Sequence, residues 1–300
     1  TDAPCLDWPF AILVGIPKHL WASDKYIMNH TQPLITSDEV LTQPLPPILW
    51  DVEPLISRGD RVVVFGEFGS FKSWILLHLA WHIATGAKWL DTFNISEPRR
   101  VLYIDEEMAQ RTLRRRAKRL ADGMETPTKG AQLAFLSRAG VRFDAVGAGA
   151  LLSYLREHRY KPDVVIVEAL RRVLIGNENE ASDLAAFWRN LEVISRLGIT
   201  CIISHHMSKP PMGPGKRALR HRASGSTDIL AGSDASFAVE RVGPQTARIT
   251  GIKARDDSEL APFDVCLEDK GDRMGPVTLS PTRQSYTEPT DLESVFRRPV

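Results

Sequence analysis

The stretch Gly66-Glu67-Phe68-Gly69-Ser70-Phe71-Lys72-Ser73 decides the fold, because it follows an apolar run and directly precedes a helical pattern. It follows the P-loop pattern G-x-x-x-x-G-K-[ST], in which backbone N–H groups and a helix N-terminus surround phosphate groups. Lys72 would supply positive charge there, and Ser73 would supply a hydroxyl for Mg²⁺. Phe71 departs from the pattern, since it stands where the second Gly is usual, and its ring would narrow the loop or shield phosphates from water. A chance Lys-Ser pair opening an amphipathic helix is the alternative, but the flanking strand and both glycines favour a phosphate loop.

Strand and helix patterns alternate after residue 61. Short apolar runs predict buried parallel strands at Val62–Phe65, Val101–Ile104, Leu133–Leu136, Val164–Val167 and Ile199–Ser204. Helices are expected at Lys72–Thr85, Ala109–Asp122, Ala145–His158 and Ser182–Leu197. Shorter strands at Ala235–Glu240, Ala247–Ile252 and Phe263–Leu267 are expected as antiparallel additions to the sheet edge. The sequence therefore predicts an α/β fold with a mainly parallel sheet flanked by helices and antiparallel strands at its C-terminal edge.

Three segments follow from the composition of the 300 residues. Residues 1–50 are rich in proline and lack a sustained period, so they are expected to form an arm that clasps a neighbouring subunit or lies on its own domain. Residues 51–268 form the expected α/β domain, and residues 269–300 are a polar, proline-containing tail. The first residue is Thr rather than Met, as expected for a piece of a longer protein.

Composition and charge exclude several classes of protein. A hydrophobic content of 43% supplies a core and argues against a disordered or collagenous chain. The 38 basic and 37 acidic residues nearly cancel, so any polyanion site must come from local clustering. The three cysteines, Cys5, Cys201 and Cys266, are far apart and imply no disulfide framework, which favours a reducing, cytoplasmic setting. No apolar run is long enough for a bilayer span, and no signal-peptide pattern is present, so no membrane contact is expected.

Acidic and histidine residues follow three of the predicted strands. Asp105, Glu106 and Glu107 follow one strand, where they would orient an attacking water or simply form an acidic helix N-terminus. Glu168 ends the apolar run Val164–Val167 in the Walker B layout, although Asp is the usual residue there. His205 and His206 end a further strand, where adjacent side chains point to opposite faces, so at most one of them faces a ligand. A zinc site is disfavoured because no nearby Cys or acid completes it.

Together these segments resemble the RepA-like branch of the RecA/DnaB-type P-loop ATPases, the ring-forming replicative helicase family, over roughly residues 48–268. Four segments carry the resemblance: the phosphate loop, residues 103–108, the run 165–170 with Gly176-Asn177-Glu178-Asn179, and residues 205–209. It implies ATP and Mg²⁺ as cofactors. The residues implied to contact the nucleotide are Gly66, Glu67, Phe68, Gly69, Ser70, Phe71, Lys72, Ser73 and Trp74.

The resemblance also implies roles for individual residues. Glu107 would be the catalytic base, Glu168 with Ser73 would hold Mg²⁺, and His206 would sense the γ-phosphate. Arg255 would act as a trans arginine finger with Lys253 as its companion, although a solvated strand end explains both equally well from the residues alone. Hydrolysis would then need a homo-oligomer, a hexamer by resemblance. Phe71 and Glu168 put the turnover rate in doubt more than nucleotide binding.

Basic residues gather in two places. The loop 207–225 lies where the resembled family contacts nucleic acid. We expect it to bind the phosphates of single strands in a salt-sensitive way, without base stacking because it has no aromatic residue. The alternative is an ordinary solvated loop. Its basic candidates are Lys209, Lys216, Arg217, Arg220 and Arg222. A second run, Arg111 to Arg119, spreads charge around most of a helix and is interpreted as solvated or interfacial.

The functional prediction is a ring-forming, ATP-hydrolysing motor or helicase that acts on nucleic acid in plasmid, phage or mobile-element replication. The alternatives are a nucleotide-gated DNA-binding scaffold with weak hydrolysis and a recombination-type loader that forms filaments.

Overall fold

The computed structural model describes residues 34–207, 222–223, 228–254, 260–269 and 276–282. The chain divides into two units, Thr1–Pro47 and Ile48–Val300. Within the first unit, the helix α1 (Ser37–Thr42) begins with a capping box in which the Thr36 hydroxyl accepts from the Glu39 amide and the Glu39 carboxylate accepts from Thr36. None of the α1 residues is buried.

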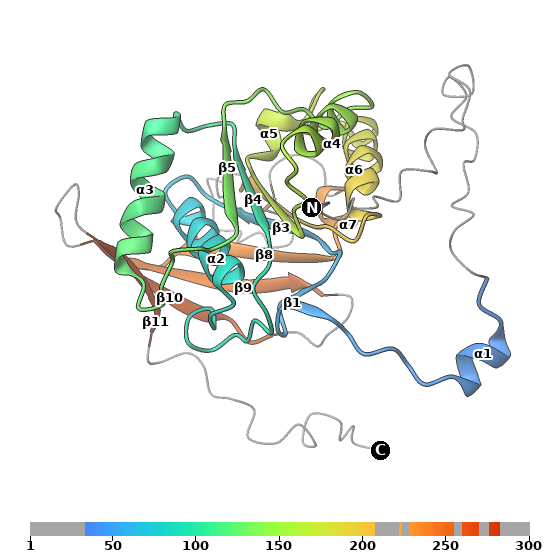
Figure 1. Cartoon of the computed structure of the whole chain (residues 1–300), viewed down its shortest axis with the longest axis horizontal. Coiled ribbons are helices and arrows are strands. Elements are labelled where there is room, and N and C mark those ends of the chain that lie inside the picture. Colours follow the sequence, from blue (N-terminus) through green and yellow to red (C-terminus); the bar gives the residue numbers. More distant parts are fainter. Residues whose placement is uncertain (1–33, 208–221, 224–227, 255–259, 270–275, 283–300) are drawn as a thin grey trace, which may run out of the picture. The chain divides into compact units, whose positions relative to one another are not determined.

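The second unit is built on one nine-stranded sheet (Figure 1). Its strand order is β11-β10-β9-β8-β3-β7-β6-β4-β5. The strands are β3 (Arg61–Gly66), β4 (Val101–Asp105), β5 (Leu133–Ser137), β6 (Val164–Glu168), β7 (Thr200–His206), β8 (Ala235–Arg241), β9 (Thr246–Lys253), β10 (Phe263–Asp269) and β11 (Val277–Pro281). The six strands from β8 to β5 run parallel, and β9, β10 and β11 are added antiparallel. The predicted mainly parallel sheet with an antiparallel C-terminal edge is therefore confirmed.

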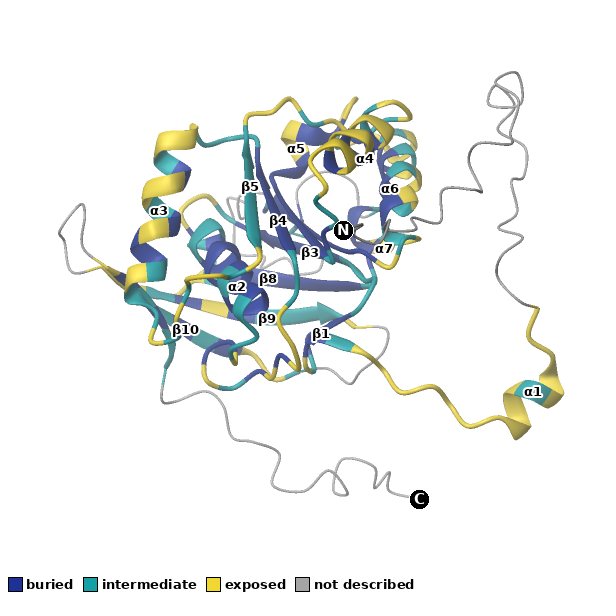
Figure 2. Cartoon of the chain, in the orientation of Figure 1, coloured by how far each residue is buried: buried dark blue, intermediate teal, exposed yellow. Residues whose placement is uncertain are grey.

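Helices cover both faces of this sheet. They are α2 (Lys72–Thr85), α3 (Gln110–Gly123), α4 (Gly147–Glu157), α5 (Leu170–Val173), α6 (Ala181–Ser195) and α7 (Asp228–Ala231). Alternation along β3 shows the two layers, since Val62 and Val64 pack in the core with α2 and α3, whereas Val63 and Phe65 pack with α4 to α7. Figure 2 shows the buried strands between the two layers.

Two expectations about the C-terminal part were wrong. β8 pairs parallel with β3, in register from Val62 opposite Ala235, rather than antiparallel at an edge. Its first five residues are buried because it lies inside the sheet between β3 and β9. The sheet also continues beyond residue 268, since β11 pairs with β10 and buries Val277 and Leu279. The predicted tail at 269–300 therefore contains a strand, which packs so closely on α3 that a Cβ at Gly123 would overlap the Val277 carbonyl oxygen.

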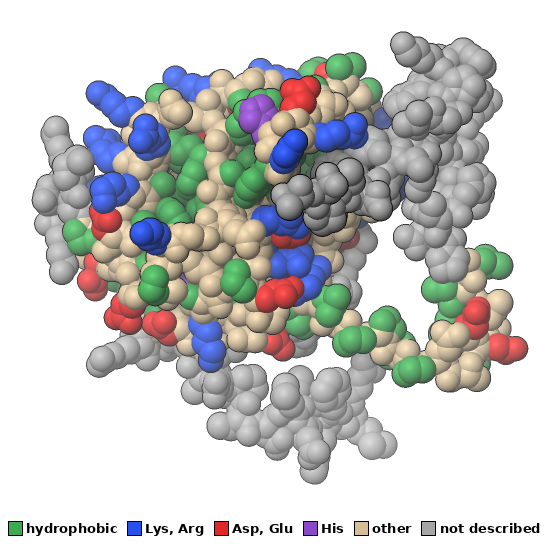
Figure 3. All heavy atoms as spheres, in the orientation of Figure 1, with side chains coloured by type: hydrophobic (Ala, Val, Ile, Leu, Met, Phe, Trp, Pro, Cys, Tyr) green, Lys and Arg blue, Asp and Glu red, His purple; other side chains and the backbone are tan. Residues whose placement is uncertain are grey.

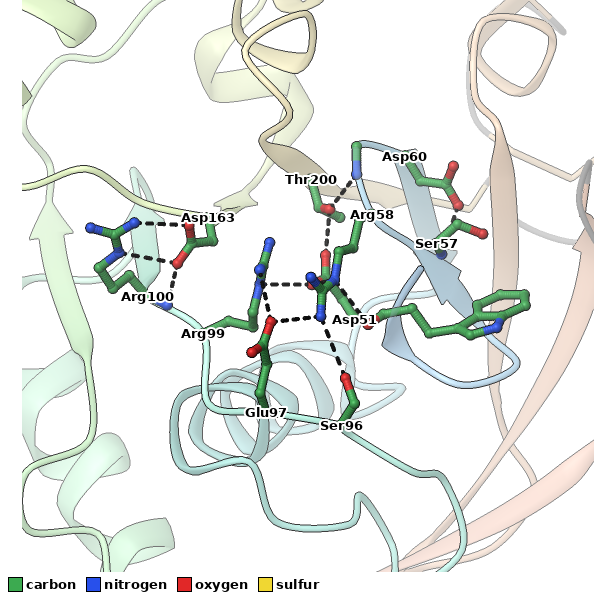
Figure 4. Close-up of polar contacts among 12 residues, drawn as sticks. Asp51, Ser57, Arg58, Asp60, Ser96, Glu97, Arg99, Arg100, Asp163 and Thr200 are labelled. Carbon is green, nitrogen blue, oxygen red and sulfur yellow. Dashed lines mark hydrogen bonds and ion pairs between the residues drawn. The ribbon is translucent and has the colours of Figure 1, made fainter. Parts of the chain in front are cut away.

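A polar cluster fixes the hairpin β1 (Trp50–Val52) and β2 (Ile56–Ser57) to the amino ends of the parallel strands (Figure 4). Buried Asp51 accepts from the Thr200 hydroxyl at 2.5 Å and lies 3.1 Å from Arg99. Burial raises the pKa of Asp51, although Thr200 and Arg99 act in the opposite direction. Beside this cluster, the Asp163 carboxylate accepts from Nη2 and Nε of Arg100 at 3.0 and 3.1 Å. The contacts tie the start of the domain to β4, β6 and β7, opposite the edge that carries the phosphate loop.

Within the described part of the chain, the helices are too short or too polar to cross a bilayer.

Candidate nucleotide site

The phosphate loop joins β3 to α2 at the carboxyl edge of the sheet. Gly66 must be glycine, because a Cβ there would overlap the backbone oxygen of Val239 on β8. Gly69 and Phe71 both adopt left-handed backbone conformations, with φ of +78° and +68°. Phe71 therefore takes the conformation that the usual glycine adopts easily, at the conformational cost that a side chain carries in this region. The geometry explains why a glycine is expected at position 71.

Lys72 begins α2 and is turned back into the loop. Its Nζ donates to the carbonyl oxygens of Gly66 and Glu67 at 2.6 and 2.7 Å. Burial lowers the pKa of Lys72 to about 8, although the carboxylates of Glu168, Glu107 and Glu67 oppose this change. The ammonium is thus held in the concave side of the loop, where it can meet a phosphate group.

The structure separates the three acids that follow β4. Asp105 is fully buried, and its Oδ1 accepts from the amides of Glu107 and Met108 at 2.9 and 2.7 Å. Glu106 turns to another loop and accepts from the amides of Gly140 and Val141. Asp105 and Glu106 therefore shape the segment, which leaves Glu107 to face the phosphate loop.

Glu107 is half-buried and lies beside two cationic or ionisable groups. Its Oε1 is 3.7 Å from His206 Nε2 and 3.9 Å from Arg172 Nε. His206 chiefly holds the pKa of Glu107 below its usual value, against the effect of burial. The carboxylate is therefore ionised near neutral pH, as a group that orients or deprotonates water must be. The expectation that one histidine at most faces the site is met, because His205 is buried and the His206 side chain is 35% exposed.

Glu168 ends β6 under the phosphate loop. Burial, and next the charge of Asp105, raise the pKa of Glu168 to about 7, while a hydrogen bond with Ser73 acts to lower it. A serine hydroxyl and a carboxylate are hard oxygen donors of the kind that Mg²⁺ takes, usually one or two from the protein with the rest from substrate phosphates and water. No cluster of three or more His, Cys, Asp or Glu with ligand geometry occurs among the described residues. The site thus fits a Mg²⁺ ion that is held jointly with a nucleotide.

One cavity of about 420 Å³ brings these groups together. It is lined by the loop from Phe68 to Trp74 and by Glu107, Glu168 and His206. These groups come from segments up to about 140 residues apart, as the strand order of a parallel sheet allows. The cavity is the candidate nucleotide site.

Two arginines of this cavity were missed by the sequence analysis. Arg241, at the end of β8, places its guanidinium 4.7 Å from the centre of the Phe71 ring. The guanidinium of Arg116, on α3, lies 5.1 Å from the centre of the Trp74 ring. Both line the cavity and add cationic groups near its aromatic wall. Arg116 belonged to the basic run that was interpreted as solvated or interfacial, and no local signal distinguished it from its neighbours.

Other expected residues lie outside this cavity. Lys253 donates to the carbonyl oxygens of Leu230, Ala231 and Ser233 of its own chain, so it caps α7. Arg222 joins Glu67 of the phosphate loop to Glu240 of β8, and its side chain is 13% exposed. Arg222 is therefore held between two carboxylates rather than presented to solvent. Arg255, Lys209, Lys216, Arg217 and Arg220 lie outside the described residues.

The fold and the phosphate loop define the class of protein: a P-loop ATPase domain with the RecA/DnaB-type sheet. The AAA domain family model matches residues 29–212, which is more than half of the chain, and the chain belongs to this family. No curated protein sequence matches the chain.

Many solved structures are similar to this chain, among them the following two. One, described as an ATPase domain, is 13% identical, with 70% of this chain and 82% of that chain aligned at a TM-score of 0.53. A DnaB-like replicative helicase, solved for its interactions with primase, is 14% identical over 71% of this chain and 56% of its own length, with a TM-score of 0.50. The chain thus spans little more than half of that helicase. At these identities the similarity establishes the fold.

Proposed function

We propose that this domain is an ATP-hydrolysing motor of the helicase type that acts on nucleic acid. The observation that carries the proposal is the single cavity in which the phosphate loop, Glu107, Glu168 and His206 meet. A bound Mg²⁺ ion would supply charge stabilisation at the phosphates. The structural similarity to an ATPase domain and to a DnaB-like replicative helicase supports the choice of nucleic acid as the substrate on which the motor works.

Each residue of the cavity has a distinct task in this proposal. Lys72 neutralises the phosphates from inside the loop, and Ser73 with Glu168 holds the metal ion. Glu107 orients the attacking water and accepts its proton, because it alone of the three neighbouring acids faces the loop. His206 contacts Glu107 and continues into the loop 207–225, so it links the nucleotide to the proposed nucleic-acid contact.

The finer parts of the proposal concern assembly. A homo-oligomeric ring, a hexamer by family resemblance, would bring Arg255 of one subunit to the nucleotide of the next. Lys253 would support this role from its position on β9, where it ties the strand to the end of α7. Lys209, Lys216, Arg217 and Arg220 would contact single-stranded nucleic acid, and Arg222 would anchor their loop to the phosphate loop through Glu67.

The first experiment is steady-state ATP hydrolysis with and without single-stranded DNA. Glu107→Gln should keep nucleotide binding but reduce turnover by at least about 100-fold, the usual worth of a positioned base. Glu106→Gln is the matched control, because Glu106 contacts the amides of Gly140 and Val141 rather than the cavity. Equal turnover in Glu107→Gln and the parent chain would refute the assignment of the base.

Nucleotide binding is tested separately with Lys72→Ala. The substitution removes the ammonium from the loop, so binding of a fluorescent ATP analogue should be lost while the far-ultraviolet circular dichroism stays unchanged. Unaltered affinity would mean that the nucleotide binds elsewhere.

A nucleotide-gated scaffold is the second candidate, and Phe71 favours it. Its ring lines the cavity under Arg241, where a glycine would leave more room for the phosphates. In this case hydrolysis would stay near background, with or without DNA, while a non-hydrolysable ATP analogue would still change the assembly seen by mass photometry. Negative-stain images would also distinguish rings from the filaments of a loader.

A further inference from the structure

The helix α3 presents a basic face that the nucleotide site does not use. The helix carries six basic residues and one acid, whereas the whole chain has a net charge of +1. Leu113, Ala117 and Leu120 are buried against the sheet, and Arg116 and Arg119 turn toward Trp74. The four remaining basic residues are exposed: Arg111, Arg114, Arg115 and Lys118.

These four residues form one surface, here termed the α3 basic face. Their spacing of three, four and seven positions places them on the same side of a helix. The structure thus sorts the run Arg111–Arg119, whose charge was expected to spread around the helix, into an outer face and an inner pair. Figure 3 shows Lys and Arg side chains gathered at the edge of the molecule where Figure 1 places α3.

In the part of the chain that the structure describes, few acidic side chains neutralise the α3 basic face. Within the described residues, Lys118 pairs with Asp122 at 2.8 Å, and no acidic partner lies within ion-pair distance of the other three. Like charges three or four positions apart destabilise a helix, and positive charge in the first turns opposes the helix dipole. The stability of α3 therefore does not account for these residues.

The α3 basic face is also a rigid platform. Arg119 pairs with Asp269 of β10 at 2.6 Å, and the indole N–H of Trp81 donates to the Ala117 carbonyl. These contacts hold the helix at both the α2 side and the C-terminal sheet. The four cations therefore extend over about 10 Å of a fixed helix, and a ligand that binds them does not have to order a flexible segment.

We propose that the α3 basic face binds the phosphate backbone of nucleic acid, as a contact separate from the loop 207–225. Three of the four residues are Arg, which can bind phosphate oxygens bidentately. All exposed residues of α3 are polar or charged, so the helix lacks the apolar anchors of a protein interface and the apolar face of a membrane-binding helix. A repeating polyanion such as nucleic acid can bind through its phosphates without either kind of apolar contact. Contacts of this kind do not read bases, so binding is independent of sequence and sensitive to salt.

The test compares two variants that lose the same charge. One is Arg111→Gln/Arg114→Gln/Arg115→Gln/Lys118→Gln. The control replaces by Gln four exposed cations that lie outside α3: Lys88, Arg156, Arg159 and Arg189. Anisotropy of a labelled oligothymidine of about 30 nucleotides and a duplex of about 30 base pairs is measured from about 50 to 200 mM salt. The α3 variant should bind at least about tenfold more weakly at about 100 mM, and its slope of log affinity against log salt should fall by about 2 to 3. The control should change far less in both quantities.

A third variant, Lys209→Gln/Lys216→Gln/Arg217→Gln/Arg220→Gln, separates this proposal from the proposed function. Loss of binding in the loop variant with parental binding in the α3 variant would overturn the α3 contact and leave the motor intact. Equal losses in the α3 variant and its charge-matched control, or no binding by the parent chain, would also overturn it. Polyglutamate is the remaining probe, since loss of polyglutamate binding without loss of nucleic-acid binding would assign the face to an acidic protein. The α3 variant should be no less stable than the parent in urea, because like-charge repulsion is relieved.

Discussion

A buried histidine pair on α2 makes the stability of this domain depend on pH. His78 Nδ1 accepts from the Trp89 indole N–H at 3.1 Å, so the proton of neutral His78 is on Nε2, which faces His82 Nε2 at 3.1 Å. A second proton on His78 would break the bond to Trp89. Burial, with His82 as a smaller cause, lowers the pKa of His78 well below 6.5, and burial also lowers the pKa of His82.

The direction and size of the effect follow from this geometry. A histidine with a lower pKa in the folded state binds fewer protons when folded, so its contribution to stability is complete above about pH 6.5 and declines as the pH falls below that value. From about pH 6.5 to 5.0 the unfolded chain gains a proton that His78 does not take when folded. At about 1.4 kcal/mol per pH unit, the free energy of unfolding falls by up to about 2 kcal/mol from His78 alone.

The assay is urea unfolding at about pH 8.0 and pH 5.0, followed by tryptophan fluorescence. In His78→Asn, the amide oxygen can accept from Trp89 but the side chain does not titrate, so the loss of stability between the two pH values should shrink by up to about 2 kcal/mol. His158→Asn, which replaces an exposed histidine at the end of α4, is the control and should keep the parental pH dependence. Parallel pH dependences for His78→Asn and the parent chain would refute the reasoning.

Three further predictions concern the site and its supports. Gly66→Ala should lower the free energy of unfolding by about 1 to 3 kcal/mol and weaken nucleotide binding, because the new Cβ forces β3 away from Val239; unchanged urea midpoints would contradict this. Arg222→Gln should lower the free energy of unfolding by about 1 to 2 kcal/mol in the same assay, because Glu67 and Glu240 lose the cation that they share. The loss stays moderate because both carboxylates are partly exposed to water; a rise in stability would contradict this. Arg255→Ala should keep nucleotide affinity but lose hydrolysis, and mixing it with Glu107→Gln should restore part of the activity; mixed assemblies without rescue would exclude a trans role.

Local pattern was sufficient for the parts of the fold that depend on near neighbours. The alternation of apolar strands with helices at the usual helical spacing predicted β3 to β7 and placed α2 at its observed bounds. The phosphate loop was recognisable because its backbone geometry needs glycines and a lysine at fixed spacing. The family resemblance assigned Glu107, Glu168 and His206 to one site, and their positions at the ends of parallel strands explain why they lie at one edge of the sheet.

Pairings between distant segments were decided by the tertiary structure. The pattern of β8 fits an edge or an interior strand equally well, and its parallel pairing with β3 depends on contacts more than 170 residues away. β11 was missed because its short alternation of buried and partly exposed residues is convincing only beside β10 and α3.

The sequence by itself predicted a phosphate loop and the segments that surround it, because those signals lie in short stretches with a fixed backbone geometry. Which acid of Asp105, Glu106 and Glu107 faces the cavity was decided by hydrogen bonds to backbone amides, both nearby and remote. The tertiary structure also turned Arg116 inward to Trp74 and left the α3 basic face outward, because the direction of each side chain depends on what the helix packs against. Burial and partner choice are properties of the packed chain, and they assign roles that residue type and spacing leave open.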